Sequence, residues 1–170
     1  PDGRYALSLP TGQYRVEARA PGFRLGSVDV TIAAGQTYAV DLALEPGPSL
    51  LLIDSGPWQY RSQAAYYDQA LEDNNYFADR WSITNPYAPL PTVQQLAAYD
   101  VILWSAPNDS PGYLGANGVI SDYLGLGGRL FIAGQNVANY DGVNGSMALW
   151  WSRHLKAKWL ADSSPADPLH

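Results

Sequence analysis

The pattern of hydrophobic and polar positions changes its period near residue 46. Before that point apolar and polar residues alternate, as they do when the two faces of a strand meet different surroundings. The alternation predicts four strands, at residues 5–9, 14–18, 28–32 and 38–44. Residues typical of turns separate them at 10–13, 21–23 and 33–36. The first part of the chain is therefore predicted to be a small antiparallel sheet with one apolar face.

From Leu50 onward, apolar runs of strand length alternate with helical stripes. Strands are predicted at residues 50–53, 77–83, 101–104 and 130–133. Helices are predicted within 62–74, from a Thr92 and Gln95 capping box, around 119–124, and after Ser146. Such alternation indicates right-handed crossovers and a parallel sheet with helices on both faces. The expected strand order is 2-1-3-4.

The period change also predicts the domain organisation. Residues 1–46 form a partial antiparallel β-sandwich, residues 47–49 a linker, and residues 50–170 an α/β module that is possibly truncated at its C-terminus. The joint Pro46-Gly47-Pro48 is short and rich in proline, so we expect it to be stiff.

Three motifs in the first part resemble a known family. They are Asp2-Gly3-Arg4-Tyr5, the run from Leu9 to Val16 with its LPxGxYxV pattern, and Ala20-Pro21-Gly22-Phe23. In this order they resemble the second half of a carboxypeptidase regulatory-like domain, a small transthyretin-like β-sandwich. Such domains normally begin with further strands before the first motif. The resemblance implies that residues 1–46 are part of a domain and that the chain is an excerpt of a longer protein.

The second part resembles a flavodoxin-like module related to the class I glutamine amidotransferase-like fold. The resemblance rests on the runs Tyr99–Trp104 and Gly127–Asn136. It implies a large exported bacterial protein, often a peptidase or a surface protein. In catalytic relatives a cysteine nucleophile follows the fourth strand, where this chain has Gln135. The resemblance therefore implies the scaffold without its chemistry.

Composition narrows the classes of function. The chain of 170 residues is 46% hydrophobic and only 15% charged, with a net charge of −6. An acidic chain lacks the basic surface that nucleic acid requires, and no apolar run is long enough for insertion into a membrane. With 0 cysteines, disulfides and thiolate chemistry are excluded. This composition favours an extracellular or cell-surface bacterial protein whose export signal lies outside this segment.

Ligands of open parallel sheets bind beyond the carboxyl ends of the strands, near the point where the strand order reverses. We therefore expect a site where the first, third and fourth strands of the module end. Aromatic side chains that follow the first strand add stacking surfaces. The candidate ligand-binding residues are Asp54, Ser55, Asn108, Asp109, Gln135, Asn136, Trp58 and Tyr60. Tyr87 and Tyr113 are further aromatic candidates in loops.

Motifs for catalysis or cofactors are absent from the sequence. There is no G-x-S-x-G elbow and no glycine-rich phosphate loop, and the histidines are His154 and His170. No cofactor and no metal ligand set are predicted. Asp54, Asn108 and Asp109, together with Asp141, could converge on a calcium or magnesium ion, but capping of turns and helix N-termini by Asp54 and Asp109 is favoured. Residues 139–145 are predicted to be a surface loop.

Three functions remain open from the sequence. The favoured one is a non-catalytic accessory or interaction segment of a larger exported bacterial protein, possibly a secreted peptidase, whose partners are the other domains of that polypeptide. The second is a carbohydrate- or peptide-binding module that uses the carboxyl-edge crevice, with a protein or glycan ligand. The third is a hydrolase with a carboxylate or metal site near Asp54 and Asp109.

Overall fold

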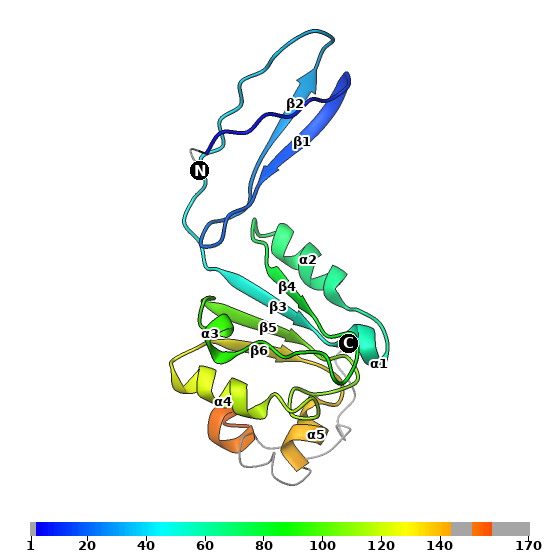
Figure 1. The fold of residues 1–170 in the computed structure, drawn as a ribbon, viewed down its shortest axis with the longest axis vertical. Helices are drawn as coiled ribbons and strands as arrows, with labels where there is room; N and C mark the ends of the chain where they lie inside the picture. The colour runs from blue at the N-terminus through cyan, green and yellow to red at the C-terminus, as the bar shows by residue number, and fades with distance from the viewer. Residues whose placement is uncertain (1–2, 144–150, 158–170) are drawn as a thin grey trace, which may run out of the picture.

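The computed structural model describes residues 3–143 and 151–157. It divides into an antiparallel hairpin with its flanking segments and an α/β module (Figure 1). This agrees with the predicted class, an α/β fold preceded by a small antiparallel part. No helix of the described residues is long and apolar enough to cross a membrane.

The hairpin pairs β1 (Gly12–Ala18) with β2 (Gly26–Ile32). Tyr14 faces Val30 and Val16 faces Val28 across the ladder, and these apolar residues are half-buried while the residues between them are exposed. The predicted alternation of two faces is therefore confirmed for these two strands.

The other two predicted strands of this part are wrong. Residues 5–9 and 38–44 run without regular pairing, linked by a hydrogen bond of 2.7 Å from the Tyr5 hydroxyl to the Val40 carbonyl. Their apolar side chains are left open, with Tyr5 52% and Leu7 64% exposed, along a groove of about 610 Å³. Alternation identifies a face but does not fix a register when no second layer packs on that face.

The module is built on four parallel strands, β3 (Leu50–Asp54), β4 (Asp79–Ser82), β5 (Val101–Ser105) and β6 (Leu130–Ala133). Their spatial order is β4-β3-β5-β6, which confirms the expected order 2-1-3-4. All five residues of β3 are buried, as the continuous apolar run predicts for a central strand.

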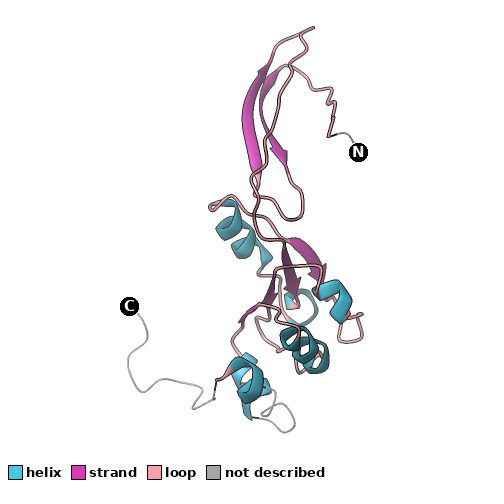
Figure 2. Ribbon diagram, turned by 90° about the vertical axis from the view of Figure 1, so that its left-hand side faces the viewer, coloured by secondary structure: helices cyan, strands magenta, loops and turns pink. Residues whose placement is uncertain are grey.

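Helices lie on both sides of this sheet (Figure 2). They are α1 (Gly56–Gln59), α2 (Ala64–Glu72), α3 (Val93–Leu96), α4 (Asn117–Gly125), α5 (Val137–Val143) and the π-helical turn η1 (Trp151–Leu155). The core packs Leu51, Ile53, Ile102 and Trp104 of the sheet against residues of α3 and α4, and α2 covers the opposite face. Most of the predicted last helix lies outside the described residues.

The local signals that delimit helices are confirmed at two places. The Thr92 hydroxyl accepts a hydrogen bond of 3.3 Å from the Gln95 amide nitrogen, and the Gln95 side chain accepts one of 2.8 Å from the Thr92 amide, which completes the capping box of α3. After α4 the chain passes through Gly127, whose φ of +88° favours glycine.

The surface loop predicted at residues 139–145 is wrong for its first half. Residues up to Val143 belong to α5, and Val137 and Asp141, four positions apart, are both buried. The polar composition of this segment hid a one-sided helix, because one of its buried positions is an aspartate.

Several contacts join the hairpin to the module. The Arg24 guanidinium donates a hydrogen bond of 2.7 Å to the Tyr76 hydroxyl, and the Leu25 amide donates one of 2.9 Å to the Asn75 carbonyl. Within the hairpin end, the Gly47 amide donates to the Gly22 carbonyl at 3.0 Å. The turn after α2 is thereby tied to the loop between β1 and β2.

Gly134 is expected to be essential for stability. A Cβ atom at this position would overlap the carbonyl oxygen of Ala106 in the backbone. We expect Gly134→Ala to lower the free energy of unfolding by about 1–3 kcal/mol, the usual cost of overpacking. Gly125→Ala is the matched control, since a Cβ there meets nothing within 4 Å and alanine favours the helix by about 0.5–1 kcal/mol. Urea unfolding of both variants measures the difference, and equal stabilities would contradict the packing argument.

Candidate functional site

The carboxyl edge of the parallel sheet gathers buried polar side chains from three segments. Asp54 ends β3 and Ser55 follows it, Asp109 and Ser110 follow β5, and Asp141 comes from α5. All five side chains are buried. The topology thus brings together residues that the sequence places at separate strand ends.

Asp54 organises the turn from β3 toward α2. One of its carboxylate oxygens accepts a hydrogen bond of 3.1 Å from the Gly56 amide, and the other accepts one from the Ser62 hydroxyl. The Ser62 oxygen in turn accepts a hydrogen bond of 3.1 Å from the Ala64 amide at the start of α2. Both oxygens of Asp54 therefore hold backbone and side-chain donors of its own loop.

Asp109 has the same role between β3 and β5. Its oxygens accept hydrogen bonds of 2.9 Å from the Ser55 hydroxyl and 3.1 Å from the Trp58 indole nitrogen. The Ser55 hydroxyl also lies 3.0 Å from the Ser105 carbonyl oxygen. Asp109 therefore fixes α1 against the end of β5.

Asp141 attaches α5 to the loop after β5. It accepts hydrogen bonds of 2.5 Å from the Ser110 hydroxyl and 3.3 Å from the Gly112 amide. The Ser110 oxygen accepts a further one of 3.1 Å from the Tyr113 amide. We call Asp54, Asp109 and Asp141, with their serine partners, the carboxylate network.

Burial is the largest influence on two of these acids. It raises the pKa of Asp109, and the hydrogen bonds from Trp58 and Ser55 partly offset the rise. Burial also raises the pKa of Asp141, against the hydrogen bonds from Ser110 and Gly112. Among the described residues no group of three or more acidic, histidine or cysteine side chains could hold a metal ion.

A crevice of about 380 Å³ opens at the same edge, on the face of the sheet that α2 covers. The start of α2 contributes Gln63, Tyr66 and Tyr67, the end of β5 contributes Ser105, and the loop after β6 contributes Gln135. Burial raises the pKa of Tyr67, Ser105 lowers it through a hydrogen bond, and the charge of Asp54 raises it further. The Tyr67 hydroxyl therefore stays protonated at neutral pH.

The predicted site residues divide between this crevice and its surroundings. Gln135 lines the crevice, whereas Asp54, Ser55 and Asp109 lie in the carboxylate network. The Asn136 side chain donates a hydrogen bond of 3.4 Å to the Asn108 carbonyl and so joins two of the edge loops.

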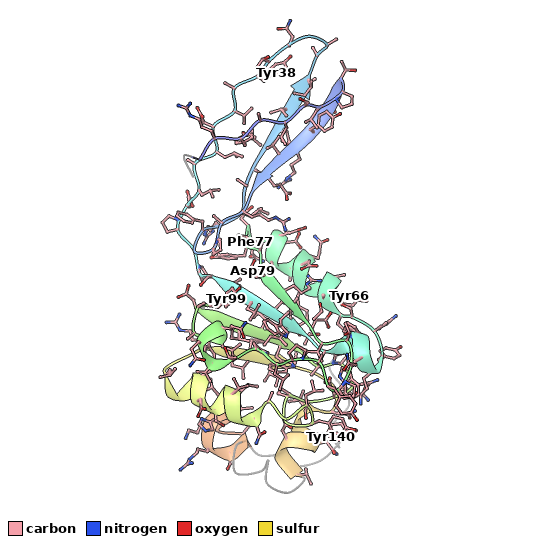
Figure 3. The ribbon with its side chains drawn as sticks, viewed as in Figure 1. Tyr38, Tyr66, Phe77, Asp79, Tyr99 and Tyr140 are labelled. Carbon is pink, nitrogen blue, oxygen red and sulfur yellow. The ribbon has the colours of Figure 1, made fainter. Side chains whose placement is uncertain are left out.

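The aromatic candidates have different surroundings. Trp58 stacks on Tyr113 at 5.9 Å between ring centres, and Tyr113 lies 5.2 Å from Tyr140, which α5 carries (Figure 3). Tyr60 stacks with the guanidinium of Arg61 at 5.3 Å. Trp58 is thus engaged on both its ring and its indole nitrogen, which makes it part of the scaffold of the edge.

Four polar residues of the crevice are not among the candidate ligand-binding residues predicted from the sequence. Tyr66 and Tyr67 fall in the helix predicted within residues 62–74, where aromatic side chains could stack on a sugar or peptide but those in loops are favoured as ligand contacts. Gln63 and Ser105 stand out by no motif. One signal was available for Ser105, which follows the apolar run of β5 with the parity of Leu103, on the face opposite the main core. No pattern in the sequence shows that the start of α2 lies beside the end of β6.

Comparisons with known proteins bear on the first part of the chain. The family model of the carboxypeptidase regulatory-like domain matches residues 1–45. This confirms the resemblance for that segment. Searches of curated proteins and of solved structures found no match.

The carboxylate network predicts a specific dependence of stability on pH. Because the pKa of Asp109 is raised above its ordinary value of 3.8, the folded chain binds this proton more readily than the unfolded chain. The stability from this group is complete below about pH 3.8 and is lost as pH rises through the folded pKa. Asp109→Asn should therefore lessen the loss of melting temperature as the pH rises above about 3.8.

Asp109→Asn has two effects that two measurements separate. The melting temperature at neutral pH reports the lost hydrogen-bond acceptor, and the change of melting temperature with pH reports the lost titration of Asp109. Asp109→Asn also removes one acceptor, so its stability should fall by about 1–3 kcal/mol at neutral pH. Asp122→Asn removes an equal charge from an exposed position of α4 and controls for net charge. A pH slope in Asp109→Asn equal to that of the unaltered chain would contradict the assignment.

Proposed function

We propose that the chain is a non-catalytic accessory and interaction segment of a larger exported bacterial protein. The observation that carries this proposal is the carboxylate network. Its three acids accept hydrogen bonds from donors of the surrounding loops, and Asp109 and Asp141 are fully buried. A general base or a nucleophile needs access to a substrate, and these groups have none.

The geometry of Ser55 supports the same proposal. Its hydroxyl is buried and is directed to Asp109 and the Ser105 carbonyl. An activated serine would need an adjacent base and an open approach for a carbonyl carbon. The contacts of Ser55 are those of a side chain that closes a loop.

We also propose a more specific fold classification for the α/β module. A parallel sheet in the order β4-β3-β5-β6 supports a flavodoxin-like module related to the class I glutamine amidotransferase-like fold. In that reading Gln135 occupies the position after β6 where catalytic relatives carry cysteine. A glutamine amide is no nucleophile, so the scaffold would serve for docking.

Spacing is the second part of the proposed role. Arg24 binds Tyr76 by a hydrogen bond and also lies 4.8 Å from the centre of its ring, while Arg19 forms an ion pair with Glu72. These contacts favour a fixed angle between the hairpin and the module. A fixed angle would hold two neighbouring domains of the same polypeptide at a defined separation.

The proposal that the protein is exported is supported by its composition and by the family match at residues 1–45. The chain contains 0 cysteines and is 12% aromatic with few charges. The carboxypeptidase regulatory-like match at residues 1–45 favours an extracellular or cell-surface setting. In this proposal the parent protein is a multidomain bacterial protein such as a secreted peptidase.

Absence of turnover is the first test. The chain should release no product from γ-glutamyl-p-nitroanilide, p-nitrophenyl acetate or azocasein above a buffer blank, with or without Mg²⁺, Ca²⁺ or Zn²⁺. The reason is that the acids and Ser55 are enclosed. Absorbance assays measure the rates. A rate that a folded Gln135→Ala or Asp109→Asn variant abolishes would overturn the proposal in favour of a hydrolase.

The fixed angle is tested by a distance measurement. Because the chain has 0 cysteines, spin labels can be introduced through Thr31→Cys in β2 and Asp122→Cys in α4. Electron-electron resonance should give one narrow distance distribution, and Arg24→Ala should broaden it because the contact with Tyr76 is lost. Arg15→Ala, which removes a contact within the hairpin, is the matched control. A broad distribution in the unaltered chain would contradict the spacing role.

A carbohydrate- or peptide-binding module is the second candidate function. The crevice beside α2 favours it, because several of its polar side chains form no hydrogen bond with any residue that the structure describes. Binding there is compatible with a non-catalytic accessory role.

A further inference from the structure

Some polar side chains of the crevice, unlike those of the carboxylate network, are not engaged in hydrogen bonds within the described residues. Within residues 3–143 and 151–157, the side chains of Gln63, Tyr66 and Gln135 form no hydrogen bond. The two amides each offer donors and an acceptor, and the Tyr66 ring is 69% exposed. These three side chains come from two segments far apart in sequence, and they converge on one hollow.

The crevice is uncharged over its whole lining. None of its residues, among those that the structure describes, is Asp, Glu, Lys, Arg or His. The buried carboxylate of Asp54 acts electrostatically on Tyr67, and the whole chain carries a net charge of −6. An anionic ligand would be repelled by these charges, and a cationic ligand would find no carboxylate in contact.

A neutral ligand with many hydroxyl groups matches this lining. Amide side chains can bridge neighbouring hydroxyls, because each presents a donor and an acceptor a short distance apart. Tyrosine rings offer a flat apolar surface to the C–H face of a sugar ring, and a phenol at the rim remains free to hydrogen-bond. Tyr66 lies on α2, whose first turn borders the crevice (Figure 3).

Extended peptides fit this place less well. Peptide recognition commonly uses main-chain pairing with an exposed strand edge or charged groups for the termini. The crevice instead lies above the ends of β5 and β6, where side chains of Ser105 and Gln135 meet the start of α2. The lining contains no charged residue that could bind a peptide terminus, whereas its amides and phenols can bind the hydroxyl groups of a neutral ligand.

We propose that this crevice binds a neutral oligosaccharide, with Tyr66 as the stacking surface and Gln63 and Gln135 as the hydrogen-bonding clamp. This inference rests on the proposed interaction role and names its ligand class. Tyr67 and Ser105 form the floor, and the Tyr67 hydroxyl contributes a donor. The parent protein would then be held at a polysaccharide surface by this module.

Calorimetric titration of the whole chain tests the proposal. The probes are the hexasaccharides of cellulose, xylan, chitin and starch, with hexagalacturonate as the anionic counterpart and pentaalanine as the peptide. Saturable binding is expected for at least one neutral hexasaccharide and for neither counterpart. Tyr66→Ala and Gln135→Ala should each weaken that binding by about tenfold or more.

Matched substitutions outside the crevice serve as controls. Tyr87→Ala removes a ring that is 93% exposed in another loop, and Gln94→Ala removes an exposed amide of α3. Both should leave the affinity unchanged. Melting temperatures of all four variants show whether each is folded, and since the altered side chains are exposed, we expect them to be.

The outcomes separate this proposal from the accessory role. Absence of binding to all four neutral hexasaccharides, or binding that Tyr66→Ala and Gln135→Ala leave unchanged, would overturn the site. Binding of pentaalanine or hexagalacturonate instead would overturn the ligand class. Mass spectrometry of the titrated sugars detects cleavage, which would overturn the non-catalytic role while the site itself stood.

Discussion

The pairing of β3 on both of its edges is the constraint on which the module depends. Its backbone joins β4 on one side and β5 on the other, and its five residues are buried. A strand in that position must be apolar along its length and can become polar only where it leaves the sheet. Asp54 and Ser55 mark that point, and the contacts of Asp54 with Gly56 and Ser62 and of Ser55 with Asp109 start from it.

The loops that cover the carboxyl edge of the sheet explain why this edge carries three buried acids. Loops that return over the end of a parallel sheet enclose backbone N–H groups that water cannot reach. Asp54, Asp109 and Asp141 satisfy such groups or the hydroxyl and indole donors beside them. The crevice lies next to this enclosed region, where Tyr66 and Gln135 remain open to a ligand.

The sheet order and the position of the edge could be predicted from the sequence, because apolar runs and helical stripes determine both. The two outer segments of the hairpin could not, since Leu7 and Tyr38 alternate correctly yet pack against no second layer. The approach of Gln63 to Gln135 was also beyond sequence reasoning, because it depends on how α2 crosses the sheet. The short helix α1 could not be predicted for a different reason, because four residues are too few to give a periodic signal.

Contacts with the module, such as that between Arg24 and Tyr76, determine how readily the hairpin unfolds locally. Within residues 3–45 only Leu25 is buried, and its amide is bound to Asn75 of the module. The hairpin thus has little apolar burial of its own and relies on its neighbour. Regions with few buried contacts unfold locally at low free energy and exchange their amide hydrogens first. We therefore expect the hairpin to be the part of the molecule that unfolds first, since its order depends on contacts with the α/β module.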